Sequence, residues 1–533
     1  MNKPADMPED EEGATVAGRI EGGIDAIVIG DGVDGLAAAT YLGKAGLHTI
    51  LVGAGKEPGG RIAVREIAPG VEGVDGEHLV GLLDPEVIAE LDLYRHGLEY
   101  AARRLDTTYF FDAYDALRFD GDLSQAANIA LDDDEERDAL EAFMAELLEL
   151  SAFLRPAFRP AVYASGDTQK MLGKTLAGAS SETASLIRRY LIASAGDVLS
   201  ARFADGPLKT LLYSEVAFRS ASAPNESLSF MPFLRRLSGE AAGLQGAVAY
   251  PAGGAIAVVT ALRRAAQGAK VDVRASAPVK SILIEGDRVA GVMLEDGGQL
   301  RAPIVVAATD ASSAFLKMIG PANIDIELQR VLTTQRPEIA TARLHFVLKG
   351  VAQDETTRAN MKRRLFYAPP VEDVTAAFLD ARAGRVPEKL IVEAVFPGAL
   401  DDKLLLDRRQ LMSVMAHPVP FDATPDDARR EAIKNAALAS IEMFATGLSE
   451  RVETVDLRLP GDEAAAVGAN AGAYAAKPDI LRQWAIAAAT AASGGINGFY
   501  FCGPEAQIGS GMSCSAARSA ARAALRAYRK GHV

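Results

Sequence analysis

The most constraining feature of the chain is a glycine motif that separates an apolar run from a small-residue helix. Residues 25–35 read DAIVIGDGVDG, and residues 36–52 continue as a helical pattern and a second apolar run, LHTILV. Gly30, Gly32 and Gly35 fit GxGxxG directly after a predicted strand. In such a βαβ unit the first glycine permits a tight turn, the second lets backbone approach a pyrophosphate, and the third lets the helix pack closely on the sheet. The motif therefore predicts a Rossmann-type dinucleotide site.

Composition narrows the class of protein. The chain has 533 residues, of which 49% are hydrophobic, so it is expected to fold into more than one domain. A net charge of -15 argues against nucleic acid and anionic lipid as partners, because both require a positive field. Only Cys502 and Cys514 occur, which predicts no disulfide framework and fits a reducing, cytoplasmic compartment. The six histidines lack ligand spacing, so no metal site is predicted.

The N-terminus and the apolar segments predict how the chain relates to membranes. Residues 1–23 are acidic and poor in large apolar residues, which predicts a disordered tail rather than a targeting peptide. No apolar run approaches the roughly 18 residues that a membrane span requires. The segment FMPFLRRL at 230–237 is the one candidate for peripheral membrane contact. Burial of this segment in a domain core is the favoured interpretation.

The remaining pattern divides the chain into interleaved blocks. Residues 279–308 read as three strands separated by EGD and EDGG turns, an antiparallel meander that leads into a buried strand. GFYFCG predicts a further strand, and the sequence from Met512 onward predicts a long helix. Residues 105–244 are mostly helical by pattern, whereas residues 321–480 mix strands and helices. We interpret these two segments as one interleaved second domain.

The segment after the second apolar run departs from the usual dinucleotide site. Such sites place Asp or Glu about 20 residues after the motif to bind a ribose hydroxyl. Here the run ends on Gly53, and Glu57 is a candidate substitute. Asp31 is expected to repel a pyrophosphate unless it points away from it. If the missing acid weakens the site, Gly53→Glu is expected to tighten binding by roughly 1 to 3 kcal/mol. Gly53 beside Lys56 also leaves open a nicotinamide cofactor with a phosphorylated ribose.

A second glycine motif, EPGGR at 57–61, follows at once. Gly59 and Gly60 let the backbone pass close to a ligand, and the Arg61 guanidinium offers a fork of donors suited to phosphate. Taken alone, such a motif is more often an ordinary turn.

Together these stretches resemble the phytoene-desaturase-related flavin oxidoreductases. The resemblance rests on residues 25–61, on LLDPEVIAELDLYRHGLEY, SAGDVLSARFADGPLKTLLYSEVAF and YPAGGAIAVVTALRRAA, on the meander, and on FYFCGPEAQIGSGM. These blocks run in family order from residue 24 to about residue 525. Within the family the chain is most similar to the branch of pyridine nucleotide-disulfide oxidoreductase domain-containing protein 2.

The resemblance implies an α/β fold in which a Rossmann-type FAD domain of the glutathione-reductase type is interleaved with an α+β substrate domain. The implied boundaries are 1–23 for the tail, 24–104, 245–320 and 481–533 for the FAD domain, and 105–244 and 321–480 for the substrate domain. By position, the implied FAD-binding residues are Gly30, Gly32 and Gly35 at the pyrophosphate, Gly59, Gly60 and Arg61 along the ribityl and phosphate path, Val279 at the adenine, and Gly503, Glu505, Gly511 and Met512 toward the flavin. Pro504 stands where many members carry an acid.

The functional hypotheses follow from this resemblance. The first is an FAD-dependent oxidoreductase that dehydrogenates, saturates or isomerises an apolar, polyene-like small molecule between the two domains. The alternatives are a binding or interaction protein that kept the fold with weak or lost flavin binding, and an NAD(P)-dependent enzyme. No catalytic side chain is predicted, because the cofactor carries the chemistry. His345 is interpreted as a structural or surface histidine rather than a substrate contact, and Arg518, Arg522 and Arg526 as a solvated helix face.

Overall fold

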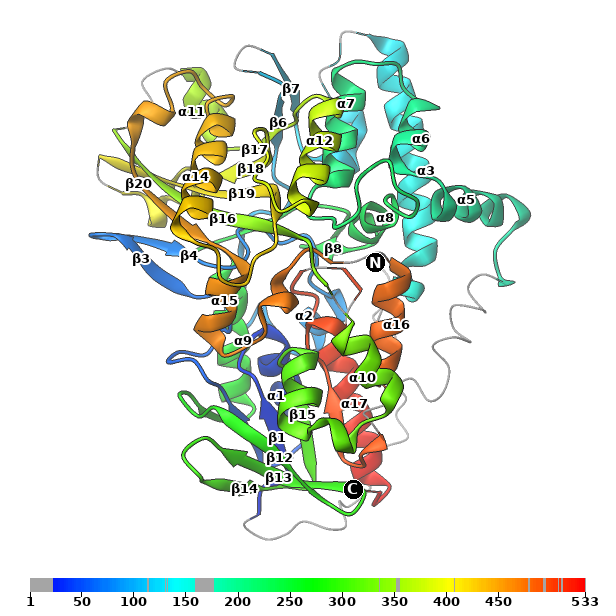
Figure 1. Ribbon diagram of the computed structural model, residues 1–533, viewed down its shortest axis with the longest axis vertical. Helices are drawn as coiled ribbons and strands as arrows, with labels where there is room; N and C mark the ends of the chain where they lie inside the picture. Colours follow the sequence, from blue (N-terminus) through cyan, green and yellow to red (C-terminus); the bar gives the residue numbers. More distant parts are fainter. Residues whose placement is uncertain are drawn as a thin grey trace.

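The computed structural model describes residues 23–532, except 113–114, 130, 132, 159–176, 335, 351–354, 407, 478–479, 492–494, 507 and 510. The predicted disordered tail therefore lies outside the described residues, apart from Gly23. Two domains are stacked along the long axis of the molecule. A Rossmann domain occupies the lower half of Figure 1, and a second domain built on a larger sheet occupies the upper half.

The Rossmann domain is built on a five-stranded parallel sheet in the order β11-β2-β1-β15-β21. Its strands are β1 (Ala26–Ile29), β2 (Thr49–Val52), β11 (Asp272–Arg274), β15 (Ile304–Ala307) and β21 (Phe499–Phe501). All except β11 are buried along their whole length. Continuous apolar runs such as AIVI and IVVA are typical of parallel strands that are covered on both faces. The strands come from three separate stretches of the chain. The exact domain boundaries given above remain predictions.

Small side chains allow three helices of this domain to pack closely. Helix α1 (Val33–Lys44) lies against both α9 (Ile256–Gly268) and α17 (Ser515–Arg529). The buried face of α17 consists entirely of alanines, and α1 also buries three consecutive alanines. Because alanine has no side chain beyond Cβ, the helix axes can approach one another and the sheet. The close packing holds the beginning of α1 against the end of β1.

The arginine-bearing face of α17 differs from its prediction. Arg518 forms ion pairs with Glu86 and Glu90 of α2 (Pro85–Glu90), and Arg522 also pairs with Glu90. The Arg518 side chain is only 20% exposed. The face is therefore docked onto α2 at Arg518, whereas Arg522 and Arg526 are exposed, as predicted.

The predicted meander is confirmed. Strands β12 (Val279–Glu285), β13 (Arg288–Leu294) and β14 (Gln299–Arg301) form an antiparallel three-stranded sheet, and the chain then enters β15. Strand β13 lies against β15. The beginning of β12 is thereby held near the carboxyl ends of β2 and β11.

The second domain is built on a seven-stranded sheet in the order β20-β16-β19-β18-β17-β6-β7. Its strands are β6 (Thr107–Phe110), β7 (Ala116–Phe119), β16 (Ile339–Lys349), β17 (Arg364–Tyr367), β18 (Ile391–Val395), β19 (Arg409–Pro420) and β20 (Val452–Arg458). Strands β17 and β6 run parallel, and the other neighbours run antiparallel. The remaining strands form short antiparallel pairs: β3 (Val64–Ala68) with β4 (Val71–Val74), β5 (Tyr100–Ala102) with β10 (Tyr250–Pro251), and β8 (Glu240–Ala241) with β9 (Leu244–Gln245). The β3–β4 hairpin packs on β16 and β19 and so joins the two domains.

Helices gather around the second sheet and at the junction of the domains (Figure 1). They are α3 (Asp134–Phe158), α5 (Ser181–Ile192), α6 (Ala195–Ser200), α7 (Pro207–Ala217), α8 (Met231–Leu237), α11 (Glu355–Met361), α12 (Val371–Arg382), α13 (Pro397–Leu400), α14 (Asp427–Ile441), α15 (Pro460–Val467) and α16 (Ile480–Ala491). Helix α10 (Ile326–Thr333) instead buries Leu328 and Leu332 in the core of the Rossmann domain. Phe230, Met231, Phe233 and Leu234 are at most 3% exposed, so the core interpretation of FMPFLRRL is confirmed. Within the described residues, every helix is too short or too polar to cross a bilayer.

Candidate functional site

A cavity of about 370 Å³ lies where the carboxyl ends of β1 and β2 face the second domain. Open parallel sheets bind ligands at this edge. Eight of the residues predicted to bind a cofactor line the cavity: Gly30, Gly32, Gly59, Gly60, Arg61, Val279, Gly511 and Met512. Gly35, Gly503 and Glu505 do not line it. The cavity thus brings together residues from all three sequence blocks, and their contacts with a cofactor stay predictions.

The three glycines of the first motif meet different demands. Gly30 has φ +99°, a conformation that L-residues rarely adopt, and it turns the chain out of β1. A Cβ on Gly35 would lie 1.7 Å from the carbonyl oxygen of Gly30, so only glycine lets α1 sit this close to the strand. At Gly32 the nearest atom to an added Cβ is the Cα of Gly60, 3.9 Å away. Gly32 therefore borders open cavity, as an approaching pyrophosphate would require.

The second motif packs directly against the first. Gly59 and Gly60 both have positive φ, and the Gly59 amide donates to the Asp31 carbonyl oxygen at 2.9 Å. A Cβ on Gly60 would approach the Cα of Gly32 to 2.9 Å. Gly59, Gly60 and Arg61 thus form a turn, and this turn also lines the cavity. The interpretation as an ordinary turn and the interpretation as a ligand-lining stretch are therefore compatible.

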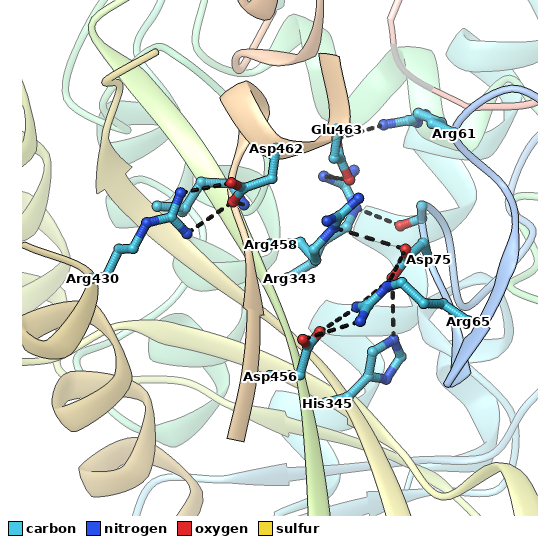
Figure 2. Close-up of polar contacts among 12 residues, drawn as sticks. Arg61, Arg65, Asp75, Arg343, His345, Arg430, Asp456, Arg458, Asp462 and Glu463 are labelled. Carbon is cyan, nitrogen blue, oxygen red and sulfur yellow. Dashed lines mark hydrogen bonds and ion pairs between the residues drawn. The ribbon is translucent and has the colours of Figure 1, made fainter. Parts of the chain in front are cut away.

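Arg61 belongs to a cluster of ion-paired side chains between the domains, formed with Glu77, Glu463 and Arg343. It forms ion pairs with Glu77 and with Glu463 of α15, and Glu463 also binds Arg343 of β16 at 2.9 Å. Figure 2 shows Arg61 and Arg343 converging on Glu463. Burial by itself would lower the pKa of Arg61, but the two carboxylates outweigh it and raise that pKa. Arg61 is therefore a permanent cation at the cavity, held in place from the second domain.

His345 lies on β16, beside this cluster of ion-paired side chains (Figure 2). Its side chain is 7% exposed, its Nδ1 lies 3.1 Å from the Ser413 hydroxyl, and its Nε2 lies 3.8 Å from Asp75. Burial lowers the pKa of His345 to about 4. His345 does not line the 370 Å³ cavity, which agrees with the structural interpretation. Near His345, Arg65 of β3 forms ion pairs with Asp75 and with Asp456 of β20. These ion pairs connect the β3–β4 hairpin to the seven-stranded sheet (Figure 2).

The acids near the cavity differ in their surroundings. Glu57, the candidate substitute for a ribose-binding acid, is 77% exposed, lies outside the cavity lining and pairs with Arg263 at 3.2 Å. Glu505 accepts a hydrogen bond from the Ala311 amide at 3.1 Å, and burial raises its pKa. Pro504 lines the cavity beside it. Two carboxylates line the cavity on the side of β2 and β12: Asp31, which is buried, and Glu295, which is exposed.

A second, smaller cavity of about 120 Å³ adjoins the first. The two share Arg219, Lys477, Gly509, Gly511 and Met512 in their linings. Apolar side chains form much of the second wall, among them Leu79, Val216, Phe218, Phe233 and Val248. Its three carboxylates, Glu77, Glu215 and Glu393, all form ion pairs with arginines.

Lys477 is the exception among the charged groups at the junction of the cavities. In the part of the chain that the structure describes, its ammonium forms no hydrogen bond and no ion pair within 4 Å. Burial lowers the pKa of Lys477, and the nearby Glu505 opposes that shift. Sequence reasoning missed Lys477, Tyr474 and Arg343, which come from the second domain and follow no motif. The turn-rich stretch VGANAGAYAAK is the one sequence signal near two of them.

No group of three or more His, Cys, Asp or Glu side chains placed to hold a metal ion occurs within the described ranges. Cys502 and Cys514 are both free and buried. The site is therefore a nucleotide-sized cleft with a small side cavity.

Comparison with known proteins decides the family. Residues 25–471 match the model of the FAD dependent oxidoreductase family. The chain belongs to this family. A mouse relative, pyridine nucleotide-disulfide oxidoreductase domain-containing protein 2, is 26% identical over 96% of this chain and 94% of its own length. The zeta-carotene-forming phytoene desaturase of Myxococcus xanthus is 29% identical over 37% of this chain and 36% of its own length.

Solved structures of this family's fold confirm the predicted fold class. An oxidoreductase from Methanosarcina mazei has a TM-score of 0.60 and 13% identity, and the match covers 94% of this chain and all of that one. This chain thus shares its fold, a parallel sheet with an interleaved second domain, with that oxidoreductase. The likeness to phytoene-desaturase-related proteins inferred from the motifs is confirmed as well. Members of the family bind FAD.

Proposed function

We propose that this chain binds FAD in the 370 Å³ cavity and oxidises or reduces a small, mainly apolar molecule in the adjoining cavity. The observation that carries the proposal is the shared lining of the two cavities at Gly511 and Met512. The family resemblance assigns these two residues to the flavin end of the site. A substrate in the smaller cavity would then lie directly beside the flavin ring.

The residues of the cavity fit the parts of FAD. The open side of Gly32, the adjacent Gly60 and the first turn of α1 suit a pyrophosphate, because helix N-termini present unpaired amides and a partial positive charge. Val279, at the beginning of β12, suits the adenine through its backbone. Arg61 adds a fixed positive charge along the path between them and the flavin. Bound flavin would supply hydride transfer to or from a substrate carbon.

The smaller cavity supports a compact substrate with one polar group. Its volume of about 120 Å³ is below the roughly 300 Å³ at which ordinary ligand pockets begin, which favours a small molecule or one end of a longer, polyene-like molecule. The apolar wall would exclude water from the reacting carbon. Lys477 is the described cation left without a partner there, and it suits a carboxylate or carbonyl oxygen. Dehydrogenation and saturation are the proposed reactions.

Spectroscopy of the FAD-loaded protein tests the proposed reaction. We expect small unsaturated or saturated apolar acids to change the flavin redox state under anaerobic conditions, either by bleaching oxidised flavin or by reoxidising reduced flavin. The proposal fails if a broad panel of apolar acids, esters and hydrocarbons leaves both states unchanged while dithionite still reduces the flavin. Such a protein would be a binding member of the family.

Lys477→Met tests the polar end of the substrate. Removing the ammonium is expected to weaken binding of an anionic probe such as decanoate about tenfold or more, because a hydrogen bond to a charged group contributes about 1.5 to 3 kcal/mol. The perturbation of the flavin absorption spectrum by decanoate measures this affinity. Lys56→Met is the matched control, since Lys56 is exposed and outside the cavity lining. Equal affinities of the Lys477→Met variant and the unmodified chain would rule out the assigned role.

Location and partners are also proposals. We propose a cytoplasmic protein without a nucleic-acid partner, supported by the net charge of -15 and by the two free cysteines. Any membrane contact would be peripheral, and FMPFLRRL is not available for it because its large apolar side chains are buried.

A further inference from the structure

The side chain of Asp31 fills the place where dinucleotide-binding domains usually carry a different acid. A Cβ built on Gly53 would lie 1.9 Å from Asp31 Oδ2, 2.3 Å from its Cγ and 2.7 Å from its Cβ. Gly53 directly follows β2, whereas Asp31 belongs to the glycine motif after β1. The Asp31 carboxyl group therefore reaches across from one strand end to the other. It occupies the volume that a side chain at residue 53 would enter.

This carboxyl group is buried and incompletely bonded. Asp31 is 5% exposed, and its Oδ2 has no hydrogen-bond partner within the described residues. Burial raises the pKa of Asp31, while the backbone amides of Asp31 and Gly60 act in the opposite direction. A buried acceptor without a donor costs about 1 to 3 kcal/mol and is retained where a ligand or a structural role compensates for it. A ligand hydroxyl would supply the missing donor.

The surroundings of Asp31 identify which part of a ligand it would meet. Asp31 lines the cavity together with Val52, Ala54 and Val279. These residues lie at the end of β2 and the beginning of β12, and none of them lines the small second cavity. Glu57 offers no alternative, because it pairs with Arg263 outside the lining. Glu295 also lines the cavity near Val279, but it is exposed to solvent, so Asp31 is the buried carboxylate at the adenosine end.

We propose that Asp31 accepts hydrogen bonds from the ribose hydroxyls of the adenosine half of the cofactor, in place of the acid that is missing at Gly53. The inference rests on the proposed FAD function. It corrects two expectations from the sequence. Asp31 does not oppose the pyrophosphate, because its side chain lies toward β2. Gly53→Glu should weaken binding rather than tighten it, since the new side chain and Asp31 would compete for one volume. A carboxylate here also disfavours the phosphorylated ribose of NADP.

A swap of the two positions tests this assignment. The variants are Asp31→Gly, Gly53→Glu and the double variant, with glycine chosen at residue 31 because the Cβ of Asp31 also obstructs residue 53. The probes are ADP and 2′,3′-dideoxy-ADP, which differ only in the ribose hydroxyls, titrated by calorimetry into each folded protein. The unmodified chain is expected to prefer ADP roughly 10- to 100-fold, the effect of a hydrogen bond to a charged group. Asp31→Gly should lose this preference, and the double variant should regain it.

The controls separate the inference from the function on which it rests. Glu57→Ala should keep the full preference for ADP, and Gly53→Glu alone should bind both probes weakly. If the unmodified chain binds FAD and ADP but Asp31→Gly keeps the preference, Asp31 is not the ribose acceptor and the proposed function still stands. If the unmodified chain binds neither FAD nor ADP, the proposed function and the inference both fail. Circular dichroism of each variant confirms that it is folded, and the single Asp31→Gly variant decides the matter if Gly53→Glu does not fold.

Discussion

Gly35→Ala is expected to destabilise the Rossmann domain by about 3 kcal/mol or more. Its new Cβ would lie 1.7 Å from the Gly30 carbonyl oxygen, which is backbone and cannot rotate away. Helix α1 would have to move off the sheet, where it buries most of its residues against β1, α9 and α17. Overpacking of a tight core usually costs 1 to 3 kcal/mol, and a clash with backbone belongs at or above the upper end of that range. Thermal or urea unfolding followed by circular dichroism measures the loss.

Gly32→Ala is the matched variant in the same loop. Gly32 has φ -69° and ψ -176°, which alanine adopts freely, and the nearest atom to its new Cβ is 3.9 Å away. The fold should therefore keep its stability within about 0.5 kcal/mol, the usual range for substitutions away from the core. FAD binding should be lost, because the methyl group enters the space assigned to the pyrophosphate. Equal stability of Gly35→Ala and Gly32→Ala would contradict the packing derived for this motif.

Arg364→Leu is expected to cost about 3 to 5 kcal/mol at neutral pH. The Arg364 side chain is 1% exposed and binds Glu215 at 2.6 Å and Glu393 at 2.5 Å. Its removal leaves two buried carboxylates with weaker compensation, which is strongly destabilising. Arg385→Ala is the control: its ion pair with Asp380 is just as short, but its side chain is 66% exposed. Exposed pairs contribute about 0 to 1 kcal/mol, so the control should unfold near the unmodified chain.

The cost of Arg364→Leu should also depend on pH. Burial raises the pKa of Glu215, but Arg236 and Arg364 outweigh it and lower that pKa from 4.5 to about 2. The pKa of Glu393 is lowered as well, against the effect of burial, by Arg364 and His78. Because the folded pKa values are depressed, this stabilisation is complete above about pH 4.5 and is lost as the pH falls toward 2. The difference between the variant and the unmodified chain should therefore shrink in acid, and a difference constant from pH 7 to pH 3 would contradict the account.

Local patterns predicted the Rossmann domain well for a physical reason. Parallel strands buried on both faces require continuous apolar runs, and a meander requires turn residues at fixed spacing, so AIVIG, IVVAA and the EGD and EDGG turns indicate their structures without further information. The cofactor residues implied by the resemblance lie mostly around one cavity. Arg518 alone departs from the predicted solvated face, because its partner Glu90 is distant in sequence.

The rest of the site depends on contacts that no local pattern encodes. Lys477, Tyr474 and Arg343 reach the cavity from the second domain, and their positions follow from how that domain packs on the first. Asp31 is the residue whose interpretation differs most between the sequence and the structure. Its charge beside a glycine motif suggests repulsion, yet the parallel pairing of β1 and β2 places residues 31 and 53 side by side. The proposed role of Asp31 would account for both the acid that is missing at Gly53 and the unexpected acid at residue 31.

Titration of the full-length protein with FAD tests the central claim most directly. The account predicts one FAD bound per chain and, at 100 times the dissociation constant, a stabilisation of the fold by about 2.7 kcal/mol. Gly32→Ala, folded but obstructed, should show neither effect. Absence of binding and of thermal stabilisation in the folded, unmodified chain at millimolar FAD would contradict the claim that this cavity is a flavin site.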